Sequence, residues 1–277
     1  MVRRKCADLY GREQPEWIET RLNTELNAIT EFGYADLYYI AHKLVKYSKD
    51  HGYPVGSRGS VGSSLVAYLA DITEVNPLAP HYRCPSPTCR TTILGDAGYG
   101  CGADMPDLVC PDCGTPMLKD GFNIPFEQFL GFEGNKIPDI DLNFSSEFRS
   151  TAEQYTEVLF GQDNVFKAGT VLSIAERTAY RYVKEYHEKK GQDIRGVEVN
   201  RLIRGLTGVR RTTGQHPGGI IVLPHGDEIY NYTPVQRPAD AVDSRIVTTH
   251  FDYHALEKSL VKLDILGQEC PTMIRLL

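Results

Sequence analysis

Two pairs of cysteines constrain the folding of this 277-residue chain more than any other feature. Five of the seven cysteines fall within about thirty residues, and four of them form the pairs Cys84-x4-Cys89 and Cys110-x2-Cys113. This paired spacing is typical of a zinc ribbon, in which four thiolates surround one Zn²⁺ tetrahedrally. Such a site has no open position, so its zinc would be structural. Because segment 78–121 is rich in Pro and Gly and lacks periodicity, we expect an inserted module there.

The alternative to a zinc site is a set of scattered free thiols, which the local density of cysteines disfavours. The N-terminus carries basic residues without an apolar stretch behind them, so it does not resemble a secretory signal. We therefore expect a reducing, cytoplasmic location, where metal binding is commoner than disulfides. The sequence contains no run of about 18 apolar residues, so no membrane span is predicted. Cys101 is expected to remain a free thiol.

A strand predicted over 136–144 carries two acids on one face. Side chains alternate along a strand, so Asp139 and Asp141 point with Asn143 to one side, and the apolar residues between them point to the other. Two such carboxylates can share hard cations, which is what two-metal phosphoryl transfer requires. The alternative is a chance Asp-x-Asp pair on a solvated strand face.

A second apolar strand, predicted over 259–266, carries Asp264 on the face opposite its branched residues. An acid in such a run is unfavourable unless it is paired or binds a cation. Two strands that each present acids from an apolar background indicate a site with three metal ligands. A sheet-edge acid paired with Lys262 or with an arginine is the alternative.

The loop over 56–64, Gly-Ser-Arg-Gly-Ser-Val-Gly-Ser-Ser, follows a short strand expected at 53–55 and precedes a helix from Leu65. Glycines let a backbone approach a phosphate closely, and the first amides of a helix are unpaired donors that favour an anion. Serine hydroxyls and the fork of Arg58 add further donors. The loop is therefore a candidate phosphate site, with a flexible turn as the alternative.

A basic segment lies between residues 167 and 211, where eleven Lys and Arg stand against five Asp and Glu, although the whole chain has a net charge of -6. A helix is predicted over 173–191, opened by a Ser173-x-x-Glu176 capping box. A basic stripe on this helix could follow phosphates without reading sequence, and a solvated face paired with Glu185 and Glu188 is the alternative. The basic residues concerned are Arg177, Arg181, Lys184, Arg210 and Arg211.

The remaining patterns predict a mixture of helices and a small sheet. Two helices are expected over 17–51 with Gly33 between them, a shorter helix over 197–206, and a buried strand over 220–223. With 41% hydrophobic residues the chain can bury a core of one or two domains. His216, His250 and His254 are interpreted as turn residues rather than catalysts.

Five motifs in order resemble those of C-family bacterial replicative DNA polymerases, and the cysteine insertion resembles the PolC type, the DNA polymerase III alpha subunit. The resemblance covers the chain from about residue 17. The motifs are Gly-Ser-Arg-Gly-Ser-Val-Gly-Ser-Ser (56–64), Pro-Asp-Ile-Asp-Leu-Asn-Phe (138–144), Thr-Thr-Gly-Gln-His-Pro-Gly-Gly (212–219), Thr-Thr-His-Phe-Asp (248–252) and Lys-Leu-Asp-Ile-Leu-Gly (262–267).

This resemblance implies an α+β fold: a polymerase-beta-like nucleotidyl transferase palm with an inserted four-cysteine zinc module and an inserted helical thumb. It implies a DNA-directed DNA polymerase that joins deoxynucleoside triphosphates to primer-template DNA. The expected segments are a helical lead-in (1–52), palm (53–77, 122–170 and 212–277), zinc module (78–121) and thumb (171–211). Sliding-clamp and other replisome contacts would belong to the full-length protein.

The resemblance also assigns residues. Asp139, Asp141 and Asp264 would bind two catalytic Mg²⁺. The loop would hold the triphosphate through Ser57, Arg58, Gly59, Ser60, Gly62 and Ser63. The DNA contacts would be Arg177, Arg181, Lys184, Arg210, Arg211 and Lys262.

Two departures from the family pattern shape these expectations. Cys84-x4-Cys89 stands where the family pattern is Cys-x2-Cys, which puts the geometry of that knuckle in question. The exonuclease, PHP and fingers domains are absent, so we expect a fragment cut at both ends that extends primers poorly. Two competing hypotheses are a stand-alone nucleotidyl transferase for a small acceptor and a non-catalytic zinc-ribbon adaptor. The adaptor hypothesis predicts that the three acids lie apart.

Overall fold

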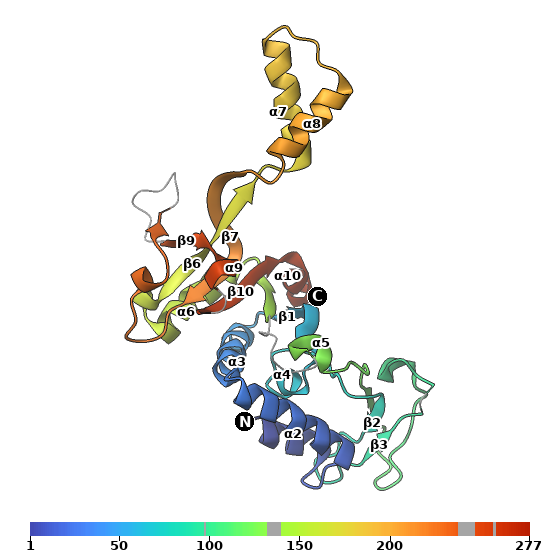
Figure 1. The fold of residues 1–277 in the computed structure, drawn as a ribbon. Coiled ribbons are helices and arrows are strands. Elements are labelled where there is room, and N and C mark those ends of the chain that lie inside the picture. The colour runs from blue at the N-terminus through green and yellow to red at the C-terminus, as the bar shows by residue number, and fades with distance from the viewer. Residues whose placement is uncertain (97, 132–139, 238–246, 257–258) are drawn as a thin grey trace. The chain divides into compact units, whose positions relative to one another are not determined.

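The computed structural model describes residues 1–96, 98–131, 140–237, 247–256 and 259–277. These residues form two units, one of residues 1–156 with 264–277 and one of residues 157–263 (Figure 1). Both contain helices and strands, so the mixed α and β class is confirmed. None of the helices in the described ranges is long and apolar enough to cross a membrane.

Helices dominate the N-terminal part of the first unit (Figure 1). The two helices predicted over 17–51 are present, and Gly33 follows the first with a φ of 74°, the left-handed conformation common after helix ends. The first of them buries Ile18, Leu22 and Ile29. The helices of this region are α1 (Val2–Tyr10), α2 (Glu16–Glu31), α3 (Ala35–Asp50), α4 (Leu65–Leu69) and α5 (Glu127–Leu130).

Two strands of the first unit and β10, whose residues from 264 on belong to that unit, form the sheet region that carries the acids. Strand β1 (Gly56–Arg58) pairs antiparallel with β5 (Asp141–Ser145), and β5 pairs parallel with β10 (Val261–Gln268). The predicted alternation in β5 is confirmed, because Leu142 and Phe144 are buried while Asp141 is half-buried. Residues 136–139 of the predicted strand lie outside the described residues. Helices α6 (Arg149–Phe160) and α10 (Glu269–Leu276) follow β5 and β10 in the chain.

The cysteine-rich segment forms a small three-stranded antiparallel sheet with β2 at its centre. Its own apolar cluster contains Tyr82, Met105 and Met117 next to buried cysteines. The inserted module predicted over 78–121 is therefore a locally packed substructure. Its elements are β2 (His81–Arg83), β3 (Thr92–Leu94), η2 (Gly102–Asp104) and β4 (Leu118–Asp120).

The second unit is built on a long antiparallel ribbon with a helical hairpin at its tip (Figure 1). Strand β6 (Val165–Ser173) pairs antiparallel with β7 (Arg210–Val222) and parallel with β9 (Thr248–Asp252), and β8 (Val235–Gln236) pairs with β9. Helices α7 (Glu176–Lys189) and α8 (Gly196–Leu206) pack through Ala179, Val183, Val199 and Ile203. The short elements are η3 (Gln162–Asn164), η4 (Ile229–Asn231) and α9 (Tyr253–Leu256).

The predictions for the second unit are partly wrong, and the errors share a cause. Ser173 lies in β6 and does not cap α7, which starts after Ala175 without a side-chain cap. Strand β7 extends over a Gly- and Pro-rich stretch that sequence patterns assign to turns, because the residues on both sides of 216–219 pair with β6. Long-range pairing has overridden local propensity in both places.

Candidate active site and metal centre

Asp141 and Asp264 stand at matching positions on neighbouring parallel strands. The register of β5 and β10 sets Asp264 beside Asp141. Residues paired in this way project from the same face of a sheet, with strands roughly 4.8 Å apart. Carboxylate oxygens at this spacing fit a hard divalent cation such as Mg²⁺. Asp139, the third predicted ligand, lies outside the described residues.

The burial of Asp264 confirms what its apolar sequence context predicted. Its side chain is 6% exposed, and the neighbouring Leu263 and Ile265 are 4% and 0% exposed. Asn143, two residues after Asp141 on the same face of β5, has a buried Oδ1 without a hydrogen-bond partner within the part of the chain that the structure describes. The face that carries the acids is thus lined by oxygen atoms withdrawn from solvent.

The Gly-Ser loop begins beside this pair of acids. Strand β1 places Arg58 opposite Asp141. A Cβ atom built on Gly59 would lie 3.8 Å from Oδ2 of Asp141, so the loop backbone passes close to the carboxylate. Two of the predicted metal ligands, Asp141 and Asp264, and the start of the predicted phosphate loop therefore lie close together, within the first unit. Over Gly59–Ser63 the loop forms the 3₁₀ turn η1.

The six predicted nucleotide-binding residues differ in their access to solvent. Ser57 and Ser60 are half-buried, Arg58 and Gly59 are exposed, and Gly62 and Ser63 are buried. The Ser57 hydroxyl lies 2.7 Å from that of Thr73, and the Ser63 hydroxyl donates to the carbonyl of Ser60. The exposed part of the loop is therefore its first half.

The prediction that the first amides of the helix after the loop are open to a phosphate is wrong. The first amides of α4 are not open donors, because those of Leu65 and Val66 each donate to the carboxylate of Glu25 over 3.0 Å. The amide of Ala67 donates to the Ser64 hydroxyl, which caps the helix. An acid of the chain itself occupies the position that an anion would take, so any phosphate must bind to the preceding loop.

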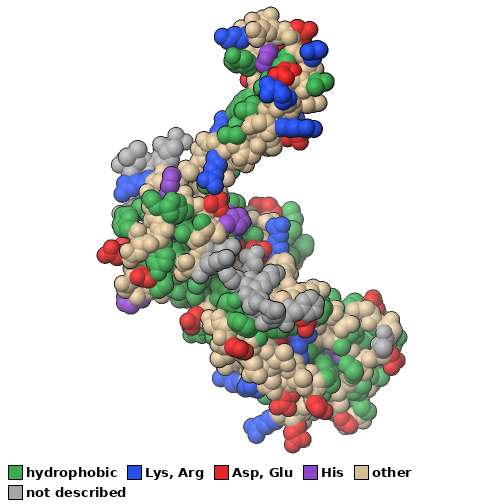
Figure 2. Space-filling model, viewed as in Figure 1, with side chains coloured by type: hydrophobic (Ala, Val, Ile, Leu, Met, Phe, Trp, Pro, Cys, Tyr) green, Lys and Arg blue, Asp and Glu red, His purple; other side chains and the backbone are tan. Residues whose placement is uncertain are grey.

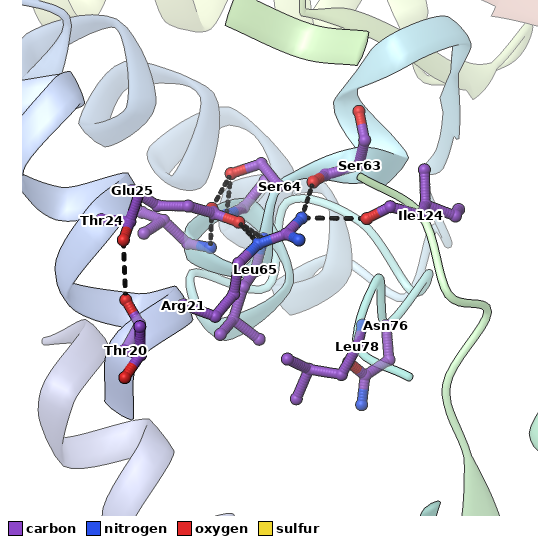
Figure 3. A network of polar contacts seen from close by, with 12 residues as sticks. Thr20, Arg21, Thr24, Glu25, Ser63, Ser64, Leu65, Asn76, Leu78 and Ile124 are labelled. Carbon is purple, nitrogen blue, oxygen red and sulfur yellow. Dashed lines mark hydrogen bonds and ion pairs between the residues drawn. The ribbon is translucent and has the colours of Figure 1, made fainter. Parts of the chain in front are cut away.

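Glu25 and its neighbour Arg21 were missed by the sequence patterns (Figure 3). Burial raises the pKa of the fully buried Glu25, and Arg21, whose Nε lies 2.6 Å from Oε1, opposes that shift. Nη2 of Arg21 donates to the carbonyls of Ser63 and Ile124 over 2.8 and 3.0 Å. A signal was present, because Glu25 falls at helical spacing on the buried stripe of Ile18, Leu22 and Ile29.

The four predicted zinc ligands come together. The sulfur atoms of Cys84, Cys89, Cys110 and Cys113 lie within 4.8 Å of one another. The Cys84–Cys113 and Cys89–Cys110 sulfur pairs are 3.4 and 3.6 Å apart. A tetrahedral zinc with Zn–S distances of about 2.3 Å needs sulfur atoms roughly 3.8 Å apart, so the cluster fits zinc in spite of its Cys-x4-Cys spacing.

The thiols of this cluster differ in acidity. Hydrogen bonds to Thr115 lower the pKa of Cys113 to about 6, whereas burial raises the pKa of Cys84 to about 12. Cys101 stays outside the cluster, and its thiol donates to Asp104 over 3.3 Å. The four cysteines predicted as zinc ligands therefore form a cluster that could bind zinc, and Cys101 lies outside it.

The basic residues of the second unit are only partly gathered. The guanidinium carbons of Arg181 and Arg211 lie 5.6 and 5.7 Å from the ring centre of Tyr182. Arg181 also lies 3.7 Å from Glu185, as the solvated-face alternative expects. Arg177 and Arg210 are exposed and Lys184 is half-buried. Figure 2 shows Lys and Arg beside Asp and Glu on the helical hairpin.

Lys262 and two of the histidines surround one tyrosine in the second unit. Nζ of Lys262 lies 4.1 Å from the ring centre of Tyr253, and the rings of His216 and His254 lie 5.2 and 3.9 Å from it. Asp252 accepts from His254 Nδ1 over 2.7 Å. His250 is separate and contacts Gln236. The interpretation of these histidines as turn residues overlooked this aromatic and basic cluster.

Comparison with known proteins agrees with the motifs. The model of the family described as "Bacterial DNA polymerase III alpha NTPase domain" matches residues 1–194 and 182–267. The chain is 57% identical over 274 residues to the "DNA polymerase III PolC-type" of Caldanaerobacter subterraneus, with 99% of this chain and 19% of that protein covered. It is 56% identical over 278 residues to the Bacillus subtilis protein of the same name, with 100% and 19% covered.

The chain therefore spans about a fifth of the length of these relatives. The match of the family model extends over nearly all of it, and includes the strands that carry Asp141 and Asp264. On this evidence the chain belongs to the bacterial DNA polymerase III alpha family.

Proposed function

We propose that this chain is the palm and thumb part of a replicative DNA polymerase, which joins deoxynucleoside triphosphates to a primer 3′ end. Asp139, Asp141 and Asp264 bind the catalytic cations, and the loop over 56–64 binds the triphosphate. The observation that carries the proposal is the register of β5 and β10, which sets Asp264 beside Asp141, with Gly59 close to the same carboxylate. The adaptor hypothesis has no role for this juxtaposition.

In the proposed reaction Mg²⁺ would lower the pKa of the primer hydroxyl and neutralise charge on the triphosphate. The protein's share is to position the reactants. The paired strands β5 and β10 place the carboxylates of Asp141 and Asp264 side by side on a rigid sheet. Arg58, opposite Asp141 on β1, brings a cation to the edge where the triphosphate would bind. The proposed palm has the polymerase-beta-like nucleotidyl transferase fold.

The helical hairpin α7–α8 is the proposed thumb and binds primer-template DNA without reading its sequence. Support comes from the grouping of Arg181 and Arg211 at Tyr182, since guanidinium groups bind phosphates and an aromatic ring restricts their motion. Arg177, Lys184, Arg210 and Lys262 complete the proposed contacts. The four-cysteine module binds one zinc and is structural, because four thiolates leave no position for a substrate.

The experiment that tests the site is anomalous diffraction from crystals soaked in Mn²⁺ and a deoxynucleoside triphosphate. We expect manganese between Asp141 and Asp264 and phosphates against Ser57–Ser60. In solution, Mg²⁺ at about a hundred times its Kd should add about 2.7 kcal/mol to the free energy of unfolding.

Asp264→Asn should abolish that gain, because it removes one of the two paired carboxylates. Asp50→Asn is the control, since Asp50 is a surface acid that pairs with Lys46 in the same unit. A full Mg²⁺ response in Asp264→Asn, or manganese bound only elsewhere, would refute the proposed metal site.

A further inference from the structure

The Arg21–Glu25 pair stands apart from ordinary helix ion pairs because it is buried. The Glu25 side chain is 0% exposed and that of Arg21 is 22% exposed, whereas the Lys46–Asp50 pair of α3 is 57% exposed on both sides. A buried carboxylate is strongly unfavourable without donors around it. Glu25 has four, supplied by Arg21, the Ser64 hydroxyl and the amides of two residues of α4.

All of these contacts meet at the end of the Gly-Ser loop (Figure 3). Glu25 holds Ser64, Leu65 and Val66, and Arg21 holds the carbonyl of Ser63. Tyr38 adds a hydroxyl contact of 3.1 Å to Ser64. The peptide that joins the loop to α4 is thus fixed by side chains of α2 and α3, which are far away in sequence.

The other end of the loop is fixed by the sheet. Strand β1 pairs with β5 through Gly56, Ser57 and Arg58. The backbone between these two anchors comprises residues 59–62, which include the glycine close to Asp141. With both ends held, this short span can keep its donors oriented before a ligand arrives, which lowers the entropy lost on binding.

We propose that Arg21 and Glu25 are positioning residues for triphosphate binding, which act through Ser63 and Ser64 without touching the nucleotide. This inference rests on the proposed function of the loop. The pair has two effects. It fixes the loop over 59–62, and the Glu25 carboxylate fills the anion position at the start of α4, which directs phosphates to the loop beside the metal ligands.

Two substitutions test the pair by different means. Glu25→Gln keeps the shape of the side chain but removes its charge. The new side-chain NH2 group would then face the hydrogen-bond donors that now surround the carboxylate. Arg21→Lys keeps a cation but loses the fork that reaches both Glu25 and Ser63. Ile29→Ala is the matched control, because Ile29 is a buried residue of the same helix without a polar contact to the loop.

The measurements are the Kd of Mn²⁺ alone, the Kd of a deoxynucleoside triphosphate with Mn²⁺, and hydrogen exchange of amides 59–66, at a temperature where every variant stays folded. We expect Glu25→Gln and Arg21→Lys to weaken triphosphate binding about tenfold, a change in binding free energy of about 1.4 kcal/mol. Amide exchange in the loop should rise in the same two variants. Mn²⁺ binding should stay at the wild-type value, and Ile29→Ala should change neither quantity.

The inference is overturned if Glu25→Gln binds triphosphate as the wild type does, or if Ile29→Ala weakens binding equally. Failure of the proposed function looks different, because the wild-type chain would then not bind triphosphate at all. In that case hydrogen exchange still tests whether Glu25 positions the loop. Faster exchange at amides 59–66 in Glu25→Gln but not in Ile29→Ala supports the positioning role, and equal exchange refutes it.

Discussion

At the residue scale, His81 shows how a polar side chain is accommodated in the core. It is 0% exposed, its Nδ1 donates to the carbonyl of Ala79 over 2.7 Å, and its Nε2 lies 3.3 Å from the hydroxyl of Tyr10. That hydroxyl accepts in turn from Asn76, so its proton points to the ring. The contacts define a neutral imidazole, and burial lowers the pKa of His81.

We predict that His81 makes stability dependent on pH on the acid side of neutrality. Because the pKa is lower in the folded chain than the unfolded value of about 6.5, the unfolded chain binds more protons below that pH. Stability is therefore full above about pH 6.5 and declines as the pH falls, by up to about 1.4 kcal/mol per pH unit. Urea unfolding of the wild type and His81→Asn at pH 7.5 and 5.5 measures this.

His81→Asn should be less stable at pH 7.5 but should lose less on acidification than the wild type. The control is His51→Asn, which changes an exposed histidine at the C-cap of α3 whose ring contacts Tyr47 and Phe148. Equal acid sensitivity in the wild type and His81→Asn would show that His81 is not the group responsible.

At the element scale, the three strands β2, β3 and β4 are each only three residues long. Strands this short cannot hold a sheet by pairing alone. Their apolar cluster is small and includes Cys84 and Cys110 themselves, so metal binding and packing act on the same residues. The module should depend on its metal in the way that small zinc domains do.

We therefore predict that Cys89→Ser loses the zinc and unfolds the module, whereas Cys101→Ser keeps one zinc per chain. Cys101 is the matched control because it lies in the same segment but outside the cluster. Metal content after dialysis and limited proteolysis of residues 84–113 report the two effects. Retention of stoichiometric zinc by Cys89→Ser would contradict a four-thiolate site.

Strand β6 supplies a second prediction at this scale, because it lies between β7 and β9. A Cβ atom on Gly169 would lie 2.1 Å from the carbonyl oxygen of Thr249 on β9. The backbone at Gly169 cannot move away from Thr249 without breaking the pairing of β6 with β9, which is already irregular at this point. Gly169→Ala should destabilise the second unit by about 2–3 kcal/mol, as overpacking does.

Gly205→Ala is the opposing control. Nothing lies within 4 Å of a Cβ atom at Gly205, which is inside α8, so alanine should stabilise this helix by about 0.5–1 kcal/mol. Thermal unfolding of both variants measures the two shifts. A neutral Gly169→Ala would mean that β6 and β9 are not packed as closely as the structure has them.

At the scale of the whole molecule, charge is distributed unevenly along a chain with a net charge of -6. The basic segment forms the helical hairpin and the ends of its ribbon, all within the second unit. Individual exposed ion pairs there, such as Arg181–Glu185, contribute little to stability. The excess of cations is therefore available for a polyanion.

We predict that duplex DNA binding weakens as salt rises and that Arg211→Ala reduces the slope of log K against log[salt] by about 1. The change should be similar for unrelated DNA sequences, because contacts to phosphates carry no sequence information. Fluorescence anisotropy over a salt series measures it. Lys46→Ala, which removes an exposed lysine of α3, should leave the slope unchanged; an equal change would show that binding follows net charge alone.

Periodicity and spacing alone were enough to predict the four-cysteine cluster, the α2–α3 pair, the helix α8 and the alternation of β5. Each depends on contacts within a few residues or on a ligand spacing characteristic of one metal, so local physics specifies it. The burial of Asp264 is different, because its side chain lies on the face opposite Leu263 and Ile265, and these neighbours do not determine what covers that face.

Tertiary structure alone decided what surrounds those elements. The strand patterns indicate a shared site for the acids, but they do not set Asp264 directly beside Asp141 on a parallel neighbour, because register depends on which strands meet. The length of β7 and the need for glycine at 169 come from β6 and β9. Glu25 closes the start of α4 from another helix. These features depend on groups far apart in sequence, and only the folded chain brings such groups within contact distance.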